Sequence, residues 1–158
     1  MKIVVGSDHA GYRLKQEVVS WLKELGHEAA DMGTMSSESV DYPDFALKVC
    51  ESVTGAQADL GILVCGTGLG MAITANKVSG IRAVTCGDVF SARCSREHND
   101  ANVLCLGERV VGPGVARDVV EAWLGATFAG GRHQRRVDKI SDIERKYTSQ
   151  SSGGTRNA

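Results

Sequence analysis

Long apolar runs are missing from this chain of 158 residues. No stretch approaches the ~20 consecutive apolar residues that a membrane-spanning helix needs. The opening residues, MKIVVGSDH, contain neither an apolar core segment nor a small-residue cleavage site, so they predict no secretory signal. We therefore expect a cytoplasmic protein that has no membrane partner.

An excess of charge of one sign is also missing. Eighteen Lys and Arg residues balance 19 Asp and Glu residues, and the formal net charge is -1 at pH 7. A chain with this balance has no general electrostatic attraction to nucleic acid or to anionic lipid. We expect neither as a partner.

Cysteines in metal-binding or disulfide spacing are absent. The five cysteines, at 50, 65, 86, 94 and 105, are odd in number and contain no C-x-x-C pair. This pattern disfavours both a disulfide framework and a zinc site, and it fits a reducing compartment. No cluster of metal ligands is visible, so we predict no metal and no cofactor.

Short apolar runs and segments of helical periodicity alternate along the chain. Apolar residues make up 42% of it, enough for a core of one domain. Strands are predicted over 2–7, 27–33, 59–65, 81–86 and 102–107, and helices over 12–25, 42–53, 68–76, 89–97, 113–128 and 132–147. In the helix over 113–128, the spacing directs Val115, Val119 and Trp123 inward.

This alternation predicts an α/β fold, a single-domain, doubly wound, five-stranded parallel sheet of Rossmann-like type with helices on both faces. The domain is predicted to span 1–147. Residues 148–158, rich in small polar side chains, are predicted to form a disordered tail.

Polar groups follow three of the predicted strands. They are Asp8-His9 after the first, Cys65-Gly66-Thr67-Gly68 after the third, and Gly107-Glu108-Arg109 after the fifth. Ligands of doubly wound sheets bind outside the carboxyl ends of the strands. We expect these groups to converge there, and we assign His98 to the same edge.

The glycine-rich turn CGTGLG resembles a phosphate loop without matching a known one. A dinucleotide fingerprint needs G-x-G-x-x-G after the first strand, and a Walker loop needs a lysine where Met71 follows Gly70. A cysteine phosphatase loop would have an arginine at position 71. The remaining interpretation is a helix N-terminus whose N–H groups bind an anion or an oxyanion.

Side chains suited to acid–base and anion chemistry accompany the turn. Cys65 ends a strand beside a helix N-terminus, which stabilises a thiolate, although buried filler is the plain alternative. His9 and His98 are candidate acid–base groups, with solvated loop histidines as the alternative. Arg132 and Arg136 share one helical face and, with Arg109, could clamp a phosphate.

The motifs together resemble type B ribose-5-phosphate isomerases. GSDHAG, SSESVDYPDFA, CGTGLGMAITANK, IRAV, HNDANVL, GERVVG, AWL and GGRHQRRV occur in that family's order and with similar spacing. The resemblance covers residues 2 to about 146. It implies an aldose–ketose isomerase that interconverts ribose 5-phosphate and ribulose 5-phosphate without a metal.

The resemblance also implies a role for each site residue. Cys65 is the base that moves a proton between C1 and C2, and His98 assists opening of the furanose ring. Thr67 adds a hydroxyl to the N–H groups of Gly66, Gly68 and Gly70 around the enediolate. The implied substrate-binding residues are Asp8, His9, Tyr42, Asn99, Arg109, Arg132 and Arg136. Family members are dimers or tetramers, so the resemblance implies a homodimer or homotetramer whose sites are shared between subunits.

Three other functions stay open on the sequence. One is isomerisation of a six-carbon phosphosugar, allose or galactose 6-phosphate. A second is a non-catalytic flavodoxin-like module whose turn holds a phosphate or nucleotide. A thiol redox protein is disfavoured because Cys65 has no resolving cysteine within its turn.

Overall fold

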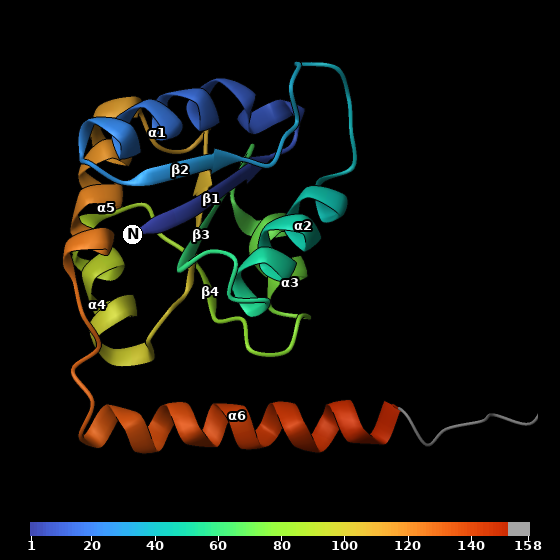
Figure 1. Cartoon of the computed structure of the whole chain (residues 1–158), viewed down its shortest axis with the longest axis vertical. Coiled ribbons are helices and arrows are strands. Elements are labelled where there is room, and N and C mark those ends of the chain that lie inside the picture. Colours follow the sequence, from blue (N-terminus) through green and yellow to red (C-terminus); the bar gives the residue numbers. More distant parts are fainter. Residues whose placement is uncertain (152–158) are drawn as a thin grey trace, which may run out of the picture.

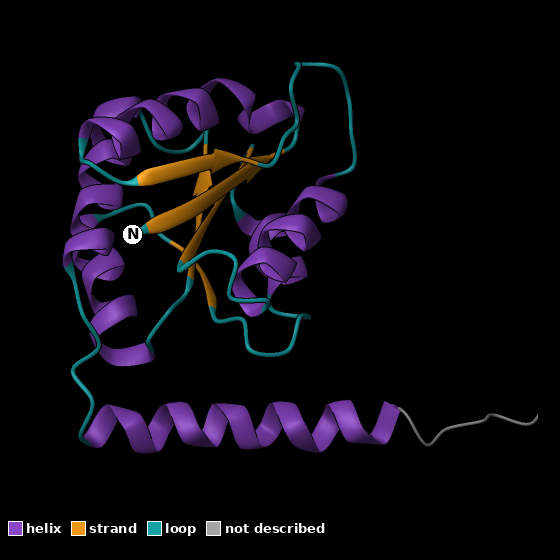
Figure 2. Cartoon of the chain, viewed as in Figure 1, coloured by secondary structure: helices purple, strands orange, loops and turns teal. Residues whose placement is uncertain are grey.

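The sheet has five strands, all parallel, in the order β2-β1-β3-β5-β4 (Figures 1 and 2). This computed structural model describes residues 1–151. The strands are β1 (Lys2–Ser7), β2 (Glu28–Asp31), β3 (Leu60–Cys65), β4 (Ala83–Thr85) and β5 (Val103–Gly107). The order reverses between β1 and β3, so the switch point lies where Ser7 and Cys65 end their strands.

Residues 1–151 also form six α-helices and one 3-10 helix. They are η1 (His9–Gly11), α1 (Tyr12–Glu24), α2 (Tyr42–Thr54), α3 (Leu69–Ala75), α4 (Val89–Asn99), α5 (Pro113–Gly125) and α6 (Arg132–Ser151). Apolar side chains of α1, α4 and α5 pack on one face of the sheet. Those of α2 and α3 pack on the other. The predicted single-domain, doubly wound sheet is confirmed.

The central strand β3 is buried along its whole length, LGILVC. Alternate residues of β3 pack into the hydrophobic cores on the two faces of the sheet. Ile62 and Val64 face α1, whereas Leu63 and Cys65 face α2. Continuous apolar runs of this kind are typical of parallel strands covered on both faces. Helix α2 lies especially close, since a Cβ on Gly61 would come within 2.7 Å of Val49 Cγ1.

The inward face of α5 differs from the predicted one at a single position. Val119 and Trp123 are fully buried, but Val115 is 48% exposed and Ala116 is buried in its place. Adjacent helical residues lie about 100° apart, and Ala116, not Val115, shares the stripe of Val119, Val120 and Trp123. The prediction for Val115 was wrong.

Helix α6 lies apart from the three layers, beneath the amino ends of the strands (Figure 1). Glu144 accepts a hydrogen bond from the N–H of Gly80, in the loop that precedes β4. The helix continues to Ser151, four residues beyond its predicted end. The rest of the predicted tail lies outside the described residues. Within residues 1–151, no helix combines the length and apolarity that crossing a bilayer requires.

Candidate active site

Cys65 lies at the carboxyl end of β3 with its sulfur held by the glycine turn. The N–H of Gly68 donates a hydrogen bond to Cys65 Sγ at 3.0 Å, and Cys65 is 6% exposed. Gly68 has a φ of +79°, which favours glycine. A Cβ there would also meet Leu106 backbone carbon at 3.1 Å. The turn therefore fixes a donor on the sulfur before α3 begins.

The loop between β5 and α5 is hydrogen-bonded to this turn through main-chain atoms. The N–H of Glu108 donates to the Cys65 carbonyl at 2.9 Å, and that of Arg109 donates to the Gly66 carbonyl at 3.0 Å. A Cβ on Gly107 would lie 2.6 Å from the carbonyl carbon of Thr67. The Arg109 side chain lies beside Gly66, since a Cβ there would be 3.5 Å from Arg109 Cδ. The structure thus brings Arg109 to the cysteine turn, as predicted.

Asp8 and His9 follow β1 across the switch point. The Asp8 carboxylate accepts hydrogen bonds from the N–H groups of Ala10 and Gly11, and its own N–H donates to the Val64 carbonyl. His9 Nδ1 accepts from the N–H of Val40 at 3.2 Å. A neutral imidazole that accepts at Nδ1 carries its proton on Nε2. His9 is thereby oriented as an Nε2–H donor.

Tyr42 and Thr67 complete the polar groups at this edge. Tyr42 begins α2 and packs its ring over Gly70, where a Cβ would lie 2.9 Å from the ring carbons. Thr67 is exposed, and its hydroxyl accepts from the N–H of Leu69 at 3.3 Å. We call the set at this edge the carboxyl-edge cluster: Asp8, His9, Tyr42, Cys65, Gly66, Thr67, Gly68, Gly70 and Arg109.

A buried lysine that the sequence analysis missed supports the loop beside His9. Lys15 Nζ lies 2.6 Å from both carboxylate oxygens of Asp31 and donates to the Thr34 carbonyl at 2.7 Å. The residue is fully buried. The sequence did indicate that Lys15 would be buried. It lies three residues before Val18 and seven before Leu22, which places it on the apolar face of α1.

The remaining predicted residues lie at the opposite edge of the sheet. His98 and Asn99 form the last turn of α4, and that helix returns antiparallel to the strands before β5 starts at Val103. Five residues of β5 separate this end from Gly107, which pairs with Cys65, a rise of roughly 15 Å. The assignment of His98 to the carboxyl edge was wrong, because a residue just before a strand lies at its amino end.

His98 belongs to a second cluster that includes the start of α6. Its ring is stacked on that of His133, with centroids 4.3 Å apart and an interplanar angle of 3°. Arg132 Nε donates to His133 Nε2 at 3.3 Å. Burial lowers the pKa of His133, and the charges of His98, Arg132 and Arg136 lower it further. We call His98, Asn99, Arg132, His133 and Arg136 the amino-edge cluster.

The amino-edge cluster includes one residue that the sequence did not single out. His133 stands in the motif GGRHQRRV between the two arginines, and its contact with His98 comes from packing of α6 against α4. The predicted clamp of three arginines is divided within one chain. Arg132 and Arg136 lie at the amino edge, whereas Arg109 lies beside the cysteine turn.

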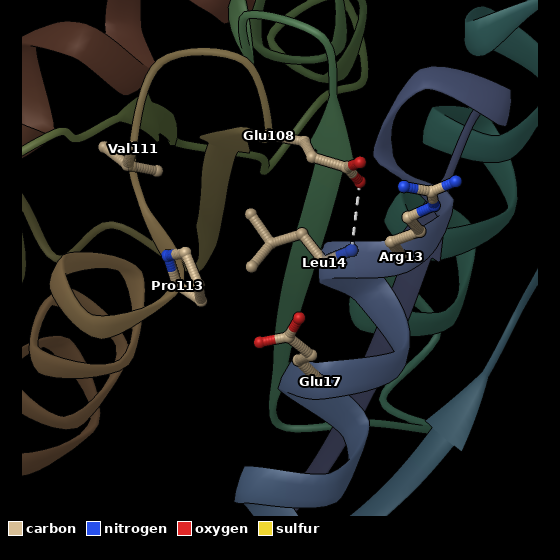
Figure 3. A pocket seen from close by; sticks show the side chains of 6 residues that line it. All are labelled: Arg13, Leu14, Glu17, Glu108, Val111 and Pro113. Carbon is tan, nitrogen blue, oxygen red and sulfur yellow. Dashed lines mark hydrogen bonds between the residues drawn. The ribbon is translucent and has the colours of Figure 1, made fainter.

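A small pocket lies between α1 and the β5–α5 loop (Figure 3). Its volume is about 180 Å³, and Arg13, Glu17, Glu108 and Val111 are among its lining residues. The Glu108 carboxylate points to the start of α1 and accepts from the N–H of Leu14 at 3.0 Å (Figure 3). A carboxylate stabilises a helix N-terminus, so Glu108 ties α1 to the loop that bears Arg109.

Comparison with known proteins decides the family. The model of the Ribose/Galactose Isomerase family matches residues 3–140. The chain belongs to this family. Ribose-5-phosphate isomerase B of Escherichia coli is 54% identical over 145 residues, which cover 92% of this chain and 97% of that protein. The resemblance inferred from the motifs is confirmed.

Two further relatives illustrate the similarity. The structure of Clostridium thermocellum ribose-5-phosphate isomerase B superposes with a TM-score of 0.92 at 60% identity, covering 93% of this chain and 99% of that one. D-erythrulose-4-phosphate isomerase of Pectobacterium atrosepticum is 40% identical, covering 91% and 95%. This chain is accordingly an isomerase.

Proposed function

We propose that this isomerase interconverts ribose 5-phosphate and ribulose 5-phosphate, with Cys65 as the base. The observation that carries the proposal is the Cys65 sulfur at the switch point of the sheet, with a turn N–H fixed on it at 3.0 Å. The 54% identity to the Escherichia coli ribose-5-phosphate isomerase B supports this substrate. Five free cysteines suit a reducing, cytoplasmic compartment.

Aldose–ketose isomerisation needs a base that removes a proton from carbon. It also needs hydrogen-bond donors that stabilise the resulting enediolate. The Cys65 thiolate takes the proton from C2 of the open-chain aldose, which leaves an enediolate. The thiol returns a proton to C1, while a hydroxyl proton passes between O1 and O2. The Gly66–Gly70 turn and the Thr67 hydroxyl supply donors for the enediolate oxygens. No electron leaves the substrate.

Other residues bind the sugar phosphate and assist ring opening. The Asp8 carboxylate, the His9 Nε2–H and Tyr42 contact the sugar and its phosphate from the carboxyl-edge cluster. His98 assists opening of the furanose ring, Asn99 binds a sugar oxygen, and Arg132 and Arg136 hold the phosphate. Arginine suits this role because its planar fork donates two parallel hydrogen bonds.

These two sets of groups lie at opposite edges of one chain, so we infer that a second copy completes the site. In a homodimer or homotetramer, the carboxyl-edge cluster of one subunit would face the amino-edge cluster of another. Exposed apolar side chains on α6 support this inference, because a second subunit could cover them. Ile140 and Ile143 are 46% and 59% exposed. In this assembly Arg109 and the pair Arg132 and Arg136 come from different chains.

Other phosphosugars are the alternative substrates. One relative is named for erythrulose 4-phosphate, a sugar that does not have five carbons, and six-carbon phosphosugars were predicted as candidates from the sequence. A non-catalytic phosphate-binding module is the alternative from another class. It requires no reaction at all and no dependence on Cys65.

The deciding experiment is a proton NMR assay of the purified, metal-chelated protein. Ribose 5-phosphate, allose 6-phosphate, galactose 6-phosphate and erythrulose 4-phosphate are each offered separately, with Cys65→Ala as the control for contaminating isomerase. We expect the highest kcat/KM on ribose 5-phosphate. A higher kcat/KM on another sugar would reassign the substrate. Turnover that appears only after a divalent ion is restored would refute the metal-free mechanism.

A further inference from the structure

Three side chains of α4 form a cluster of metal-ligating atoms, and two of them, Cys94 and Glu97, have no part in the proposed isomerase chemistry. Cys94, Glu97 and His98 stand at positions i, i+3 and i+4, the spacing that brings helical residues onto one face. The thiol sulfur, a carboxylate oxygen and an imidazole nitrogen all lie within 4.8 Å of one another. We propose that these three side chains bind a divalent transition-metal ion of the zinc type.

The donor set selects the class of ion. Thiolate and imidazole ligands favour Zn²⁺ and its neighbours, whereas Mg²⁺ and Ca²⁺ take oxygen ligands. Metal–ligand bonds of about 2.0 to 2.3 Å place two ligands of a tetrahedral ion roughly 3.5 Å apart. Atoms within 4.8 Å of one another can close to that distance by side-chain rotation. Binding releases the Cys94 thiol proton to solvent.

The charge balance permits a cation although two arginines lie nearby. A thiolate and a carboxylate together offset the two positive charges of the ion, and a neutral imidazole adds none. The complex is therefore neutral beside Arg132 and Arg136. This removes the repulsion that a bare cation would meet in the amino-edge cluster.

The three donors are available to a metal. Cys94, Glu97 and His98 are each half-buried, so an ion can reach their side chains from solvent. His98 stacks face to face on His133, and its in-plane ring nitrogens stay open. His133 is an unsuitable fourth ligand through Nε2, which accepts from Arg132. A solvent oxygen would take the fourth position, as in open zinc sites.

Cysteine spacing alone could not reveal this site. The prediction against zinc considered C-x-x-C pairs, whereas here a single cysteine cooperates with a histidine one helical turn later. Metal binding stands on the geometry of α4 and is independent of the proposed function. Its effect on turnover does rest on that proposal, because the ion would occupy the His98 nitrogen assigned to ring opening.

Titration of the metal-free protein with Co²⁺ tests the site directly. A thiolate bound to Co²⁺ gives a near-ultraviolet charge-transfer band, and tetrahedral Co²⁺ gives strong visible bands. We expect both in the wild type, with Zn²⁺ displacing Co²⁺ and Mg²⁺ leaving the bands unchanged. Absence of the charge-transfer band from the wild type, or its survival in Cys94→Ser, would overturn the proposal.

Matched variants identify the ligands. Glu97→Gln and His98→Asn should each weaken Co²⁺ affinity by at least about tenfold, since even outer-shell changes cost 10- to 100-fold. Cys65→Ser removes the thiol of the carboxyl-edge cluster and should keep the band. Loss of the band in Cys65→Ser instead would assign the metal thiolate to Cys65 and contradict the proposal. Circular dichroism of each variant confirms that α4 is intact.

Inhibition separates this proposal from the proposed function. Zn²⁺ should inhibit the wild type, and Cys94→Ser should keep its metal-free activity while resisting the ion. Zinc that binds through Cys94 without inhibiting would uphold the site and contradict the role of His98 in ring opening.

Discussion

The N–H of Gly68 donates a hydrogen bond to the sulfur of Cys65, three residues earlier, at 3.0 Å. The donor cannot turn away, because the Gly68 backbone is fixed in the left-handed region against β5. The sulfur of Cys65 therefore has one backbone donor whose position the fold fixes. Under the proposed function, this donor would need no reorganisation when Cys65 takes the proton from the sugar.

Replacing Cys65 by alanine should abolish turnover and spare substrate affinity. A general base contributes at least about 10²-fold to rate, so kcat should fall by that factor or more, while KM stays within a few-fold. Cys105→Ala is the matched control, a fully buried cysteine on the neighbouring strand that should lose about 1 kcal/mol of stability but little kcat. If Cys65→Ala kept more than about a tenth of the wild-type kcat, another group would be the base.

Mixing two inactive variants should restore activity if the site is shared between subunits. Cys65→Ala and His98→Asn homodimers each lack one group in both sites. Random reassembly gives half mixed dimers, each with one complete site of two, so about a quarter of the wild-type activity should return under C2 symmetry. The measurement is kcat after unfolding and refolding the mixture together. Activity no greater than that of separately refolded variants would place both groups in one chain.

Proton exchange should distinguish the role of His98 from that of Cys65. Ribulose 5-phosphate cannot close to a furanose because its C5 oxygen carries the phosphate. Proton transfer from this ketose therefore precedes any ring chemistry. His98→Asn should impair consumption of ribose 5-phosphate by about 10²-fold or more, yet preserve exchange of the C1 proton of ribulose 5-phosphate in D₂O.

Proton NMR in D₂O measures that exchange for each variant. Cys65→Ala should eliminate it, and Cys50→Ala serves as a control because that thiol lies on the buried face of α2 and is not part of the turn after β3. Equal loss of exchange in Cys65→Ala and His98→Asn would make His98 part of the proton-transfer machinery.

Stability should fall at alkaline pH because of two buried thiols. Burial raises the pKa of Cys50 and of Cys86 to about 11, with smaller contributions from Glu51 and Asp88. An unfolded thiol ionises near pH 8.5, so its contribution is fully present below that pH and is lost as the pH rises toward 11. Between these two pH values each thiol should lower the free energy of unfolding by up to about 1.4 kcal/mol for every unit of pH.

Urea unfolding at pH 7 and at intervals from pH 8 to about 11 measures this dependence. The double variant Cys50→Ala/Cys86→Ala should have a flatter profile than the wild type, whatever its stability at pH 7. An unchanged slope would show that other groups control alkaline unfolding.

The sequence predicted the parts of the molecule that depend on local pattern. Apolar runs such as LGILVC identify the strands, and CGTGLG identifies the turn after β3, so Cys65 and Arg109 were placed correctly. Contacts between distant segments were harder to predict. The Lys15–Asp31 pair depends on how α1 crosses β2, and the stacking of His98 on His133 depends on where α6 returns.

The order of helices and strands in the sequence is enough to place His98 at the amino edge of the sheet. The sequence analysis nevertheless assigned His98 to the carboxyl edge. In a β-α-β unit the helix returns antiparallel to the strands, so its last turn lies at the amino edge. Applied to the helix over residues 89–99, that rule separates His98 from Cys65 by chain order alone.

The glycines beneath the carboxyl-edge cluster limit what mutation can change there. An added methyl group would collide with main-chain atoms at Gly11, 2.5 Å from the Val64 carbonyl, and at Gly107, 2.6 Å from Thr67. Backbone cannot move aside as a flexible side chain can, so neither position has a mild substitution. The amino-edge cluster consists of side chains on helix surfaces, where single replacements leave the backbone in place. Under the proposed function, substitutions that alter substrate preference would therefore be tolerated better on α4 and α6 than at Gly11 or Gly107.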